Sequence, residues 1–243
     1  MKTAVVTGAS SGIGEATARL LADRGFRVIC AARRAERIEA LAKEIGGVAV
    51  ACDITKDDDV ARLVEAADGR LDVLVNNAGG ALGLEPVAEA DLDKWAQMIA
   101  TNTLGTARVT KALLPAVLKA EGIIVFVTSI AADAGYEGGA GYCAAKAGER
   151  AIVESMRLEL YDKPVRITEI CPGLVETEEF SLTRFGGDKE RAAKVYAGVA
   201  EPLTADDIAD AIVDMATRPS RVNIDRLTIR PRAQAKHKMH REG

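Results

Sequence analysis

The chain of 243 residues predicts an α/β fold, in which helices cover both faces of a parallel sheet. Short β-branched runs alternate with longer helical patterns, and several of these runs are apolar on successive residues, as strands buried on both faces require. About seven strands are expected, at Thr3–Thr7, Arg27–Ala31, Val48–Ala51, Asp72–Asn76, Gly122–Thr128, Val165–Ile170 and Arg226–Ile229. The helices between them are expected at Gly12–Arg24, Ala35–Glu44, Asp57–Ala67, Leu92–Lys119, Ala140–Leu160 and Ala205–Thr217.

We expect residues 1–243 to form a single domain, because no stretch resembles a linker or a tandem repeat and α/β sheets often reach this length as one unit. The segment Thr183–Pro202 interrupts the alternation with glycine, charge and a short helical pattern. It predicts an excursion over the sheet near the substrate, at about residues 178–202. Ligands of such sheets bind beyond the carboxyl ends of the strands, so functional residues are expected there.

Composition argues against several classes of protein. The net charge of −4 disfavours general binding to nucleic acid or anionic membranes, and the basic tail Arg230–Arg241 fits a solvated or subunit-contacting terminus better than a binding patch. Histidine occurs only at positions 237 and 240, which argues against Ser-His-Asp hydrolases, Cys-His proteases and histidine-ligated metals, so no metal is expected.

Other features point to the reducing cytoplasm. The four scattered cysteines lack CxxC pairing and fit small buried residues, at Cys30, Cys52, Cys143 and Cys171. The N-terminus turns glycine-rich too early for a signal peptide, and the longest strongly apolar stretch, Gly122–Val127, is too short to span a bilayer. We therefore expect a cytoplasmic protein without a membrane partner.

A glycine-rich turn follows the first expected strand and opens the first helix, with the sequence Thr7-Gly8-Ala9-Ser10-Ser11-Gly12-Ile13-Gly14. Its glycines permit tight backbone geometry and let a pyrophosphate approach the helix N-terminus, which favours anions. Such turns also serve plain connections, but this placement favours a dinucleotide. The candidate cofactor residues here are Gly8, Ser10, Ser11, Gly12, Ile13 and Gly14.

The end of the second strand indicates which dinucleotide is bound. NAD-preferring enzymes usually carry an acid there for the ribose 2′-hydroxyl, whereas this chain has Ala31-Ala32-Arg33-Arg34. Two guanidinium groups can instead pair with a 2′-phosphate. An ordinary basic pair on the surface is the alternative, but the missing acid favours NADP(H).

A tyrosine and a lysine lie one helical turn apart in Tyr142-Cys143-Ala144-Ala145-Lys146. An ammonium near a phenol stabilises the phenolate, so that the tyrosine can exchange protons closer to neutral pH. A lone YxxxK pair is common by chance, but Ser129 lies thirteen residues before Tyr142, just past the fifth strand. The order and spacing of Ser129 and Tyr142 closely resemble the serine and tyrosine of the short-chain dehydrogenase/reductase family.

Taken in order, the GxxxGxG turn with its leading threonine, Asp53, the NNAG run at Asn76–Gly79, Ser129, YxxxK and PGxVxT at Pro172–Thr177 resemble the short-chain dehydrogenase/reductase family over nearly the whole chain. The resemblance implies a Rossmann-type, doubly wound sheet and an oxidoreductase acting on alcohols and carbonyls.

The same resemblance implies the catalytic roles. Ser129 would bind the substrate oxygen, and Tyr142 would give or take the hydroxyl proton. Lys146 would lower the pKa of the tyrosine and bind the nicotinamide ribose, while Asn102 would hold a proton-relay water.

Further cofactor residues are carried over from the family pattern. Asp53 and Ile54 would contact the adenine, and the backbone near Val175 with the Thr177 hydroxyl would meet the nicotinamide carboxamide. The remaining cofactor residues are Asn77, Ala78 and Gly79 of the NNAG run, and Pro172 and Gly173 of the PGxVxT run.

Three stretches are similar to NADP-dependent 3-hydroxy acid dehydrogenases, a group with serine dehydrogenases and malonic semialdehyde reductases: Asn76–Pro86, Pro172–Phe185 and Arg221–Leu227. A small 3-hydroxy acid such as serine or 3-hydroxypropionate is then the expected substrate. Arg184 is the candidate cation for its carboxylate, with a plain surface arginine as the alternative. Clavulanate-type dehydrogenases share the Ala-Ala-Arg-Arg and Ile-Arg-Pro features, and a broad ketone or aldehyde reductase also fits.

Two further classes compete with an enzyme. A non-catalytic NADP(H) sensor would commonly lose the tyrosine or lysine, and a purely structural domain would leave the ordered motifs unexplained. Relatives commonly form tetramers through the long fourth and fifth helices and the last strand, so the resemblance implies a homotetramer.

Overall fold

The computed structural model describes residues 1–177, 179–236 and 238–242, so Glu178 and His237 lie outside the described residues. Seven parallel strands form one sheet in the order β3-β2-β1-β4-β5-β6-β7, which confirms the predicted fold class. The strands are β1 (Thr3–Thr7), β2 (Arg27–Ala32), β3 (Val48–Ala51), β4 (Val73–Asn76), β5 (Ile123–Val127), β6 (Arg166–Pro172) and β7 (Arg226–Ile229). Strand order reverses between β1 and β4, which creates a crevice at their carboxyl ends.

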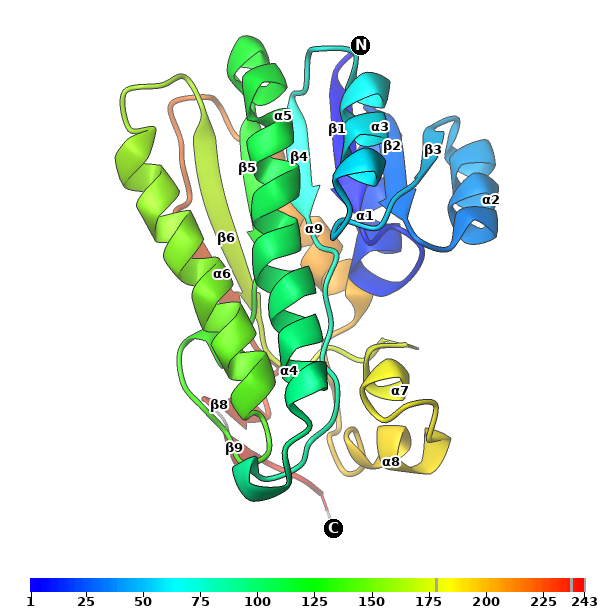
Figure 1. Cartoon of the computed structure of the whole chain (residues 1–243), viewed down its shortest axis with the longest axis vertical. Helices are drawn as coiled ribbons and strands as arrows, with labels where there is room; N and C mark the ends of the chain where they lie inside the picture. Colours follow the sequence, from blue (N-terminus) through cyan, green and yellow to red (C-terminus); the bar gives the residue numbers. More distant parts are fainter. Residues whose placement is uncertain (178, 237, 243) are drawn as a thin grey trace.

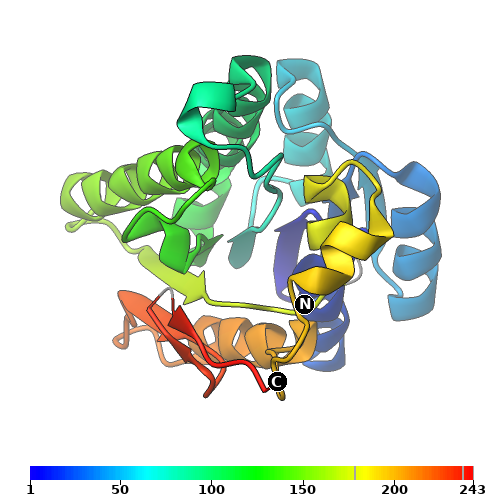
Figure 2. The same cartoon turned by 90° about the horizontal axis from the view of Figure 1, so that it is seen from below.

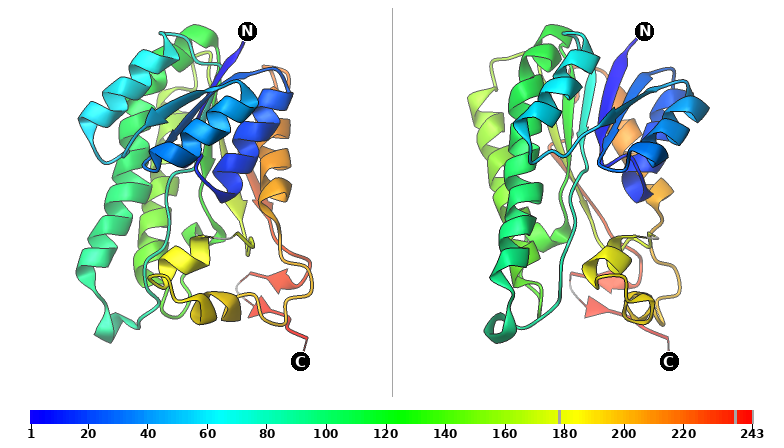
Figure 3. Two further views of the ribbon diagram at one scale, coloured as in Figure 1. Left: turned by 90° about the vertical axis from the view of Figure 1, so that its right-hand side faces the viewer. Right: turned by 45° about the vertical axis from the view of Figure 1, so that its right-hand side comes forward.

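Helices cover both faces of the sheet (Figure 3). They are α1 (Gly12–Asp23), α2 (Ala35–Ile45), α3 (Asp57–Ala67), α5 (Thr106–Ala120), α6 (Ala140–Glu159) and α9 (Ala205–Thr217). Successive residues of a strand point to opposite faces. Thus Ala4 and Val6 of β1 join the apolar core under α1 and α9, whereas Val5 joins the core under α3 and α5.

The expected continuous helix Leu92–Lys119 is wrong in one respect. A π-helical segment, η2 (Ile99–Gly105), separates α4 (Leu92–Met98) from α5. The Asn102 side chain donates 2.8 Å to the carbonyl of Met98, the acceptor that an α-helix would offer to the Asn102 backbone N–H. Such π segments are frequent at functional sites.

The predicted excursion contains two short helices, α7 (Phe180–Arg184) and α8 (Lys189–Lys194). Both lie below the carboxyl ends of the strands, at the end of the molecule opposite to the N-terminus (Figures 1 and 2). Two short 3₁₀ turns are also described, at η1 (Val87–Glu89) and η3 (Ile130–Ala132).

The basic tail folds back against the molecule, while the side chains of Arg232, Lys236, Lys238 and Arg241 are exposed to solvent. It contains an antiparallel pair, β8 (Gln234–Ala235) and β9 (Lys238–Met239), that was not predicted. Arg241 donates 3.0 Å to the Val195 carbonyl just after α8. The tail therefore packs against the excursion, and Figure 1 shows both at the same end of the molecule.

All four cysteines are buried and free, as predicted. Among the residues that the structure describes, no helix combines the length and apolar character needed to cross a bilayer.

Candidate active site

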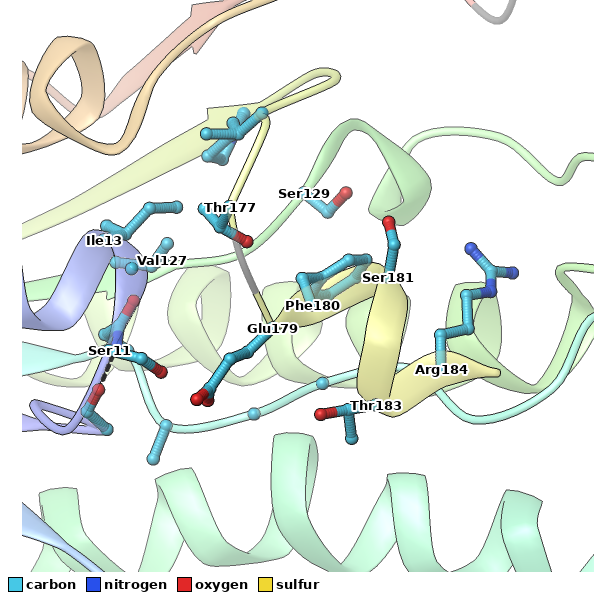
Figure 4. A pocket seen from close by; sticks show the side chains of 18 of the residues that line it. Ser11, Ile13, Val127, Ser129, Thr177, Glu179, Phe180, Ser181, Thr183 and Arg184 are labelled. Atoms are coloured by element: carbon cyan, nitrogen blue, oxygen red, sulfur yellow. Dashed lines mark hydrogen bonds between the residues drawn. The ribbon is translucent and has the colours of Figure 1, made fainter. Parts of the chain in front are cut away.

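A cavity of about 1000 Å³ lies at the crevice between β1 and β4 and extends to α7. Most of the predicted site residues line it, and Figure 4 shows part of this lining. They are Gly8, Ser10, Ser11, Gly12, Ile13, Arg33, Arg34, Asp53, Ile54, Asn77, Ala78, Gly79, Ser129, Tyr142, Lys146, Pro172, Gly173, Val175, Thr177 and Arg184. Gly14 and Asn102 are not part of the lining.

The glycines of the turn between β1 and α1 have different structural roles. Gly8 and Gly12 have positive φ angles of 67° and 53°, a backbone conformation that glycine adopts without steric penalty. Gly14 has no such angle, but a Cβ there would lie 2.3 Å from the Gly8 carbonyl oxygen. It permits close packing of the helix against the turn, and the turn itself can accept a pyrophosphate.

Thr7, the residue before this turn, connects two of the predicted cofactor loops. Its hydroxyl accepts hydrogen bonds of 3.0 Å from the backbone N–H groups of both Asn77 and Ala78. The Asn77 amide in turn donates 3.0 Å to the Thr7 carbonyl. The ends of β1 and β4 are thus held together at the floor of the crevice.

Asn102 acts on a neighbouring loop. Its amide exchanges hydrogen bonds of 3.0 and 3.1 Å with the backbone of Gly80. A Cβ on Gly79 would lie 2.4 Å from the Asn102 side-chain oxygen, so glycine is needed for this approach. Asn102 therefore positions the loop after β4. This loop lies close to Lys146, because a Cβ on Gly79 would also lie 3.6 Å from the Lys146 amine.

Arg34 lies across the glycine-rich turn. Its guanidinium donates to the Ser10 hydroxyl at 2.8 and 3.1 Å and to the Ser11 hydroxyl at 2.8 Å. Arg34 and Arg37 both form ion pairs with Glu179, a residue that the sequence reasoning missed. Burial acts to raise the pKa of Glu179, but the hydrogen bonds from Arg34 and Ser11 outweigh it, and the pKa is lowered. Figure 4 shows Glu179 turned toward Ser11.

The structure brings three of the four predicted catalytic residues together in the cavity, namely Ser129, Tyr142 and Lys146, whereas Asn102 lies behind the loop after β4. Ser129 follows β5 and hydrogen-bonds Tyr142, which lies in the first turn of α6 and is buried. Burial raises the pKa of Tyr142, while the Lys146 ammonium and the Ser129 hydrogen bond act in the opposite direction. The net pKa of the phenol stays above its ordinary value of 10.0.

Lys146 is buried, and its ammonium donates two hydrogen bonds. Its ammonium donates 3.0 Å to the Val127 carbonyl and 2.7 Å to the Glu149 carboxylate. Glu149 was not predicted; the only sequence signal for it is an acid one helical turn beyond the lysine. Burial raises the pKa of Glu149 to about 7, against the opposing effect of Lys146.

Arg184 reaches the cavity from α7. It donates 2.9 Å to the Gly83 carbonyl and 2.9 Å to the Tyr136 hydroxyl, and its guanidinium lies 5.5 Å from the centre of the Tyr136 ring. Phe180 makes an edge-to-face contact with Tyr142, with 5.9 Å between ring centres. Tyr136 also lines the cavity.

Known proteins are similar to this chain in sequence and in fold. The family model described as short chain dehydrogenase matches residues 2–184. An uncharacterised oxidoreductase of Mycobacterium tuberculosis is 60% identical, covering 96% of this chain and 92% of the relative. Serine 3-dehydrogenase of Agrobacterium fabrum is 44% identical, covering 94% and 93%. A solved closed form of serine dehydrogenase complexed with NADP+ superimposes with a TM-score of 0.93 at 35% identity, over 99% of both chains. The chain therefore belongs to the short-chain dehydrogenase family and is an oxidoreductase.

Proposed function

We propose that the protein is an NADP(H)-dependent oxidoreductase that interconverts a small 3-hydroxy acid and the corresponding carbonyl compound. One observation carries the proposal. The cavity joins a phosphate-accepting turn with an arginine across it at one end to a serine–tyrosine–lysine cluster at the other.

The cavity fits the cofactor by its chemistry. The Gly8–Gly14 turn has the open backbone that a pyrophosphate needs, and the guanidinium groups of Arg33 and Arg34 offer charge to a 2′-phosphate. The loops at Asn77–Gly79 and Pro172–Thr177 would hold the nicotinamide end. NADP(H) supplies the hydride donor or acceptor when it is bound.

Side chains of the protein bind the substrate oxygen and transfer the proton. Ser129 holds the substrate oxygen and stabilises the charge that develops on it. Tyr142 gives its phenolic proton to that oxygen during reduction and takes it back during oxidation. The nearby Lys146 ammonium favours the phenolate form, so the tyrosine works at a lower pH than a buried phenol alone.

Arg184 supports the substrate class. A guanidinium has five N–H donors, and the bonds to Gly83 and Tyr136 use two of them. The remaining donors can bind a carboxylate in bidentate fashion. The likeness to serine 3-dehydrogenase agrees with a substrate that carries both a hydroxyl and a carboxylate.

The test compares Arg184→Ala with Arg191→Ala, a control in the same excursion whose guanidinium stacks on Phe185. We expect Arg184→Ala to raise KM for L-serine and 3-hydroxypropionate with NADP+, and to leave KM for a neutral secondary alcohol unchanged. Equal effects on the acids and the neutral alcohol would remove Arg184 from substrate binding. Failure of the wild-type protein to oxidise any of these alcohols with NADP+ would contradict the proposed function itself.

We also propose that the protein is a homotetramer. Large apolar side chains are exposed on the helices expected at the interfaces, with Leu104 on η2 56% exposed and Leu158 on α6 79% exposed. Covering them with a second copy would remove this apolar surface from water. Light scattering should give the mass of four chains, and a monomeric mass would contradict the proposal.

A further inference from the structure

Glu149 is a buried carboxylate to which the proposed reaction assigns no task. Its side chain is 2% exposed and lies on α6, three residues after Lys146, with 2.7 Å between the carboxylate and the ammonium. The Thr106 hydroxyl of α5 also hydrogen-bonds it. Burying a carboxylate is unfavourable unless partners stabilise it, so this pair is a specific construction. Glu149 lies on the same helix as Tyr142, seven residues after it.

A second buried carboxylate adds to the negative charge. Glu169 of β6 is fully buried, and one of its oxygens accepts a 2.7 Å hydrogen bond from the Thr128 hydroxyl. Its other oxygen has no hydrogen-bond partner among the described residues and lies 3.5 Å from the Arg226 guanidinium of β7. Arg226 also forms an ion pair with Asp133 after η3, so part of its charge is already matched.

Besides Glu169, three titratable side chains lie near Glu149 or its partner Lys146. Tyr142 and Lys146 face it along α6, and the Cys171 thiol of β6 lies near Lys146. Burial lowers the pKa of Lys146, but the Glu149 carboxylate raises it, and the net pKa is raised. The same carboxylate raises the pKa of Tyr142.

We propose that Glu149 is a positioning residue for the tyrosine–lysine pair: its carboxylate fixes the Lys146 ammonium and sets the pH at which the pair releases a proton. Tyr142 and Lys146 titrate as a coupled pair, so the first proton is lost with a pKa that belongs to both. A negative charge beside the pair makes that loss harder, whichever residue carries the proton. Removing the charge must therefore move the proton loss to lower pH.

The inference rests on the proposed function for its meaning, but it can be tested on the cofactor-free protein. We would titrate tyrosinate formation by ultraviolet absorbance in the wild type, Glu149→Gln and Tyr142→Phe. The chain has four tyrosines, so the step that Tyr142→Phe abolishes is assigned to Tyr142. Glutamine keeps the shape and an oxygen acceptor for Lys146, and we expect its Tyr142 step about one pH unit lower than in the wild type.

Two further variants separate charge from structure. Glu149→Asp keeps the charge and should return the step toward the wild-type pH. Glu154→Gln removes a half-exposed carboxylate from the same helix and should leave the step unchanged. A Tyr142 step at the same or higher pH in Glu149→Gln, or no such step in either protein, would overturn the inference.

Kinetics give a second readout. In the oxidation of L-serine with NADP+, the acid limb of kcat/KM should move to lower pH in Glu149→Gln, while a purely structural role would change the rate at all pH values alike. If the wild type does not oxidise serine, the proposed substrate fails, but the absorbance titration still decides the role of Glu149.

Discussion

The contribution of Arg34 to cofactor choice can be worked out from its contacts. Its guanidinium makes three hydrogen bonds to Ser10 and Ser11 across the glycine-rich turn, and its side chain is 41% exposed. A charge-assisted hydrogen bond to a phosphate contributes about 1.5–3 kcal/mol, and partial exposure places this one near the middle of that range. Arg34→Ala should therefore weaken NADPH binding by about 2 kcal/mol, or roughly 30-fold.

The assay is the KM for NADPH and for NADH, measured at saturating carbonyl substrate. NADH has no 2′-phosphate, so its KM should stay within about threefold of the wild-type value, a change of under 1 kcal/mol. Arg218→Ala is a matched control, because the Arg218 side chain is 48% exposed and pairs with Asp214 of α9, away from the cavity. Equal increases in both KM values would show that Arg34 acts by shaping the turn, and an unchanged KM for NADPH would refute its role in binding the 2′-phosphate.

Three other substitutions test separate parts of the account. Gly14→Ala would place a methyl group 2.3 Å from the Gly8 carbonyl oxygen and should lower the free energy of unfolding in urea by about 2–3 kcal/mol. Gly135→Ala should have little effect, because a Cβ added there would meet no atom within 4 Å beyond its chain neighbours. The pKa of Glu149 is raised from 4.5 to about 7, so the folded protein binds its proton more tightly than the unfolded chain, and its contribution to the free energy of unfolding falls as pH rises through that interval. Glu149→Gln should abolish this fall in urea denaturation between pH 4.5 and 7, and a parallel profile would contradict the assignment. Glu179→Gln removes the carboxylate partner of the two arginines at the start of α2 and should tighten NADPH binding in a fluorescence titration, while weaker binding would show that the carboxylate orders them.

The sheet and most of the cavity lining could be predicted from the sequence. Buried parallel strands are apolar on successive residues, and their carboxyl ends meet at one edge of the sheet. The functional residues that follow β1, β4 and β5 therefore had to converge, as Gly8, Asn77 and Ser129 do.

The features that were missed depend on contacts between residues far apart in the chain. Within the π segment, Asn102 bonds Gly80, 22 positions away, as well as the Met98 carbonyl one turn before it. The partner of Arg34 at Glu179 lies 145 positions away. An acid one turn after a lysine, as at Glu149, is also common on solvent-exposed helix faces, so its burial becomes evident only from the packing of α6.

We infer that the Tyr142 hydroxyl transfers the proton, while the other residues of the cavity bind the cofactor and the substrate. The most direct measurement is turnover and NADPH affinity of Tyr142→Phe, which keeps the buried ring and its contact with Phe180. We expect kcat for reduction of the carbonyl substrate to fall by about 10²–10⁴-fold, with the dissociation constant for NADPH unchanged. Turnover at the wild-type rate with bound NADPH would contradict the account.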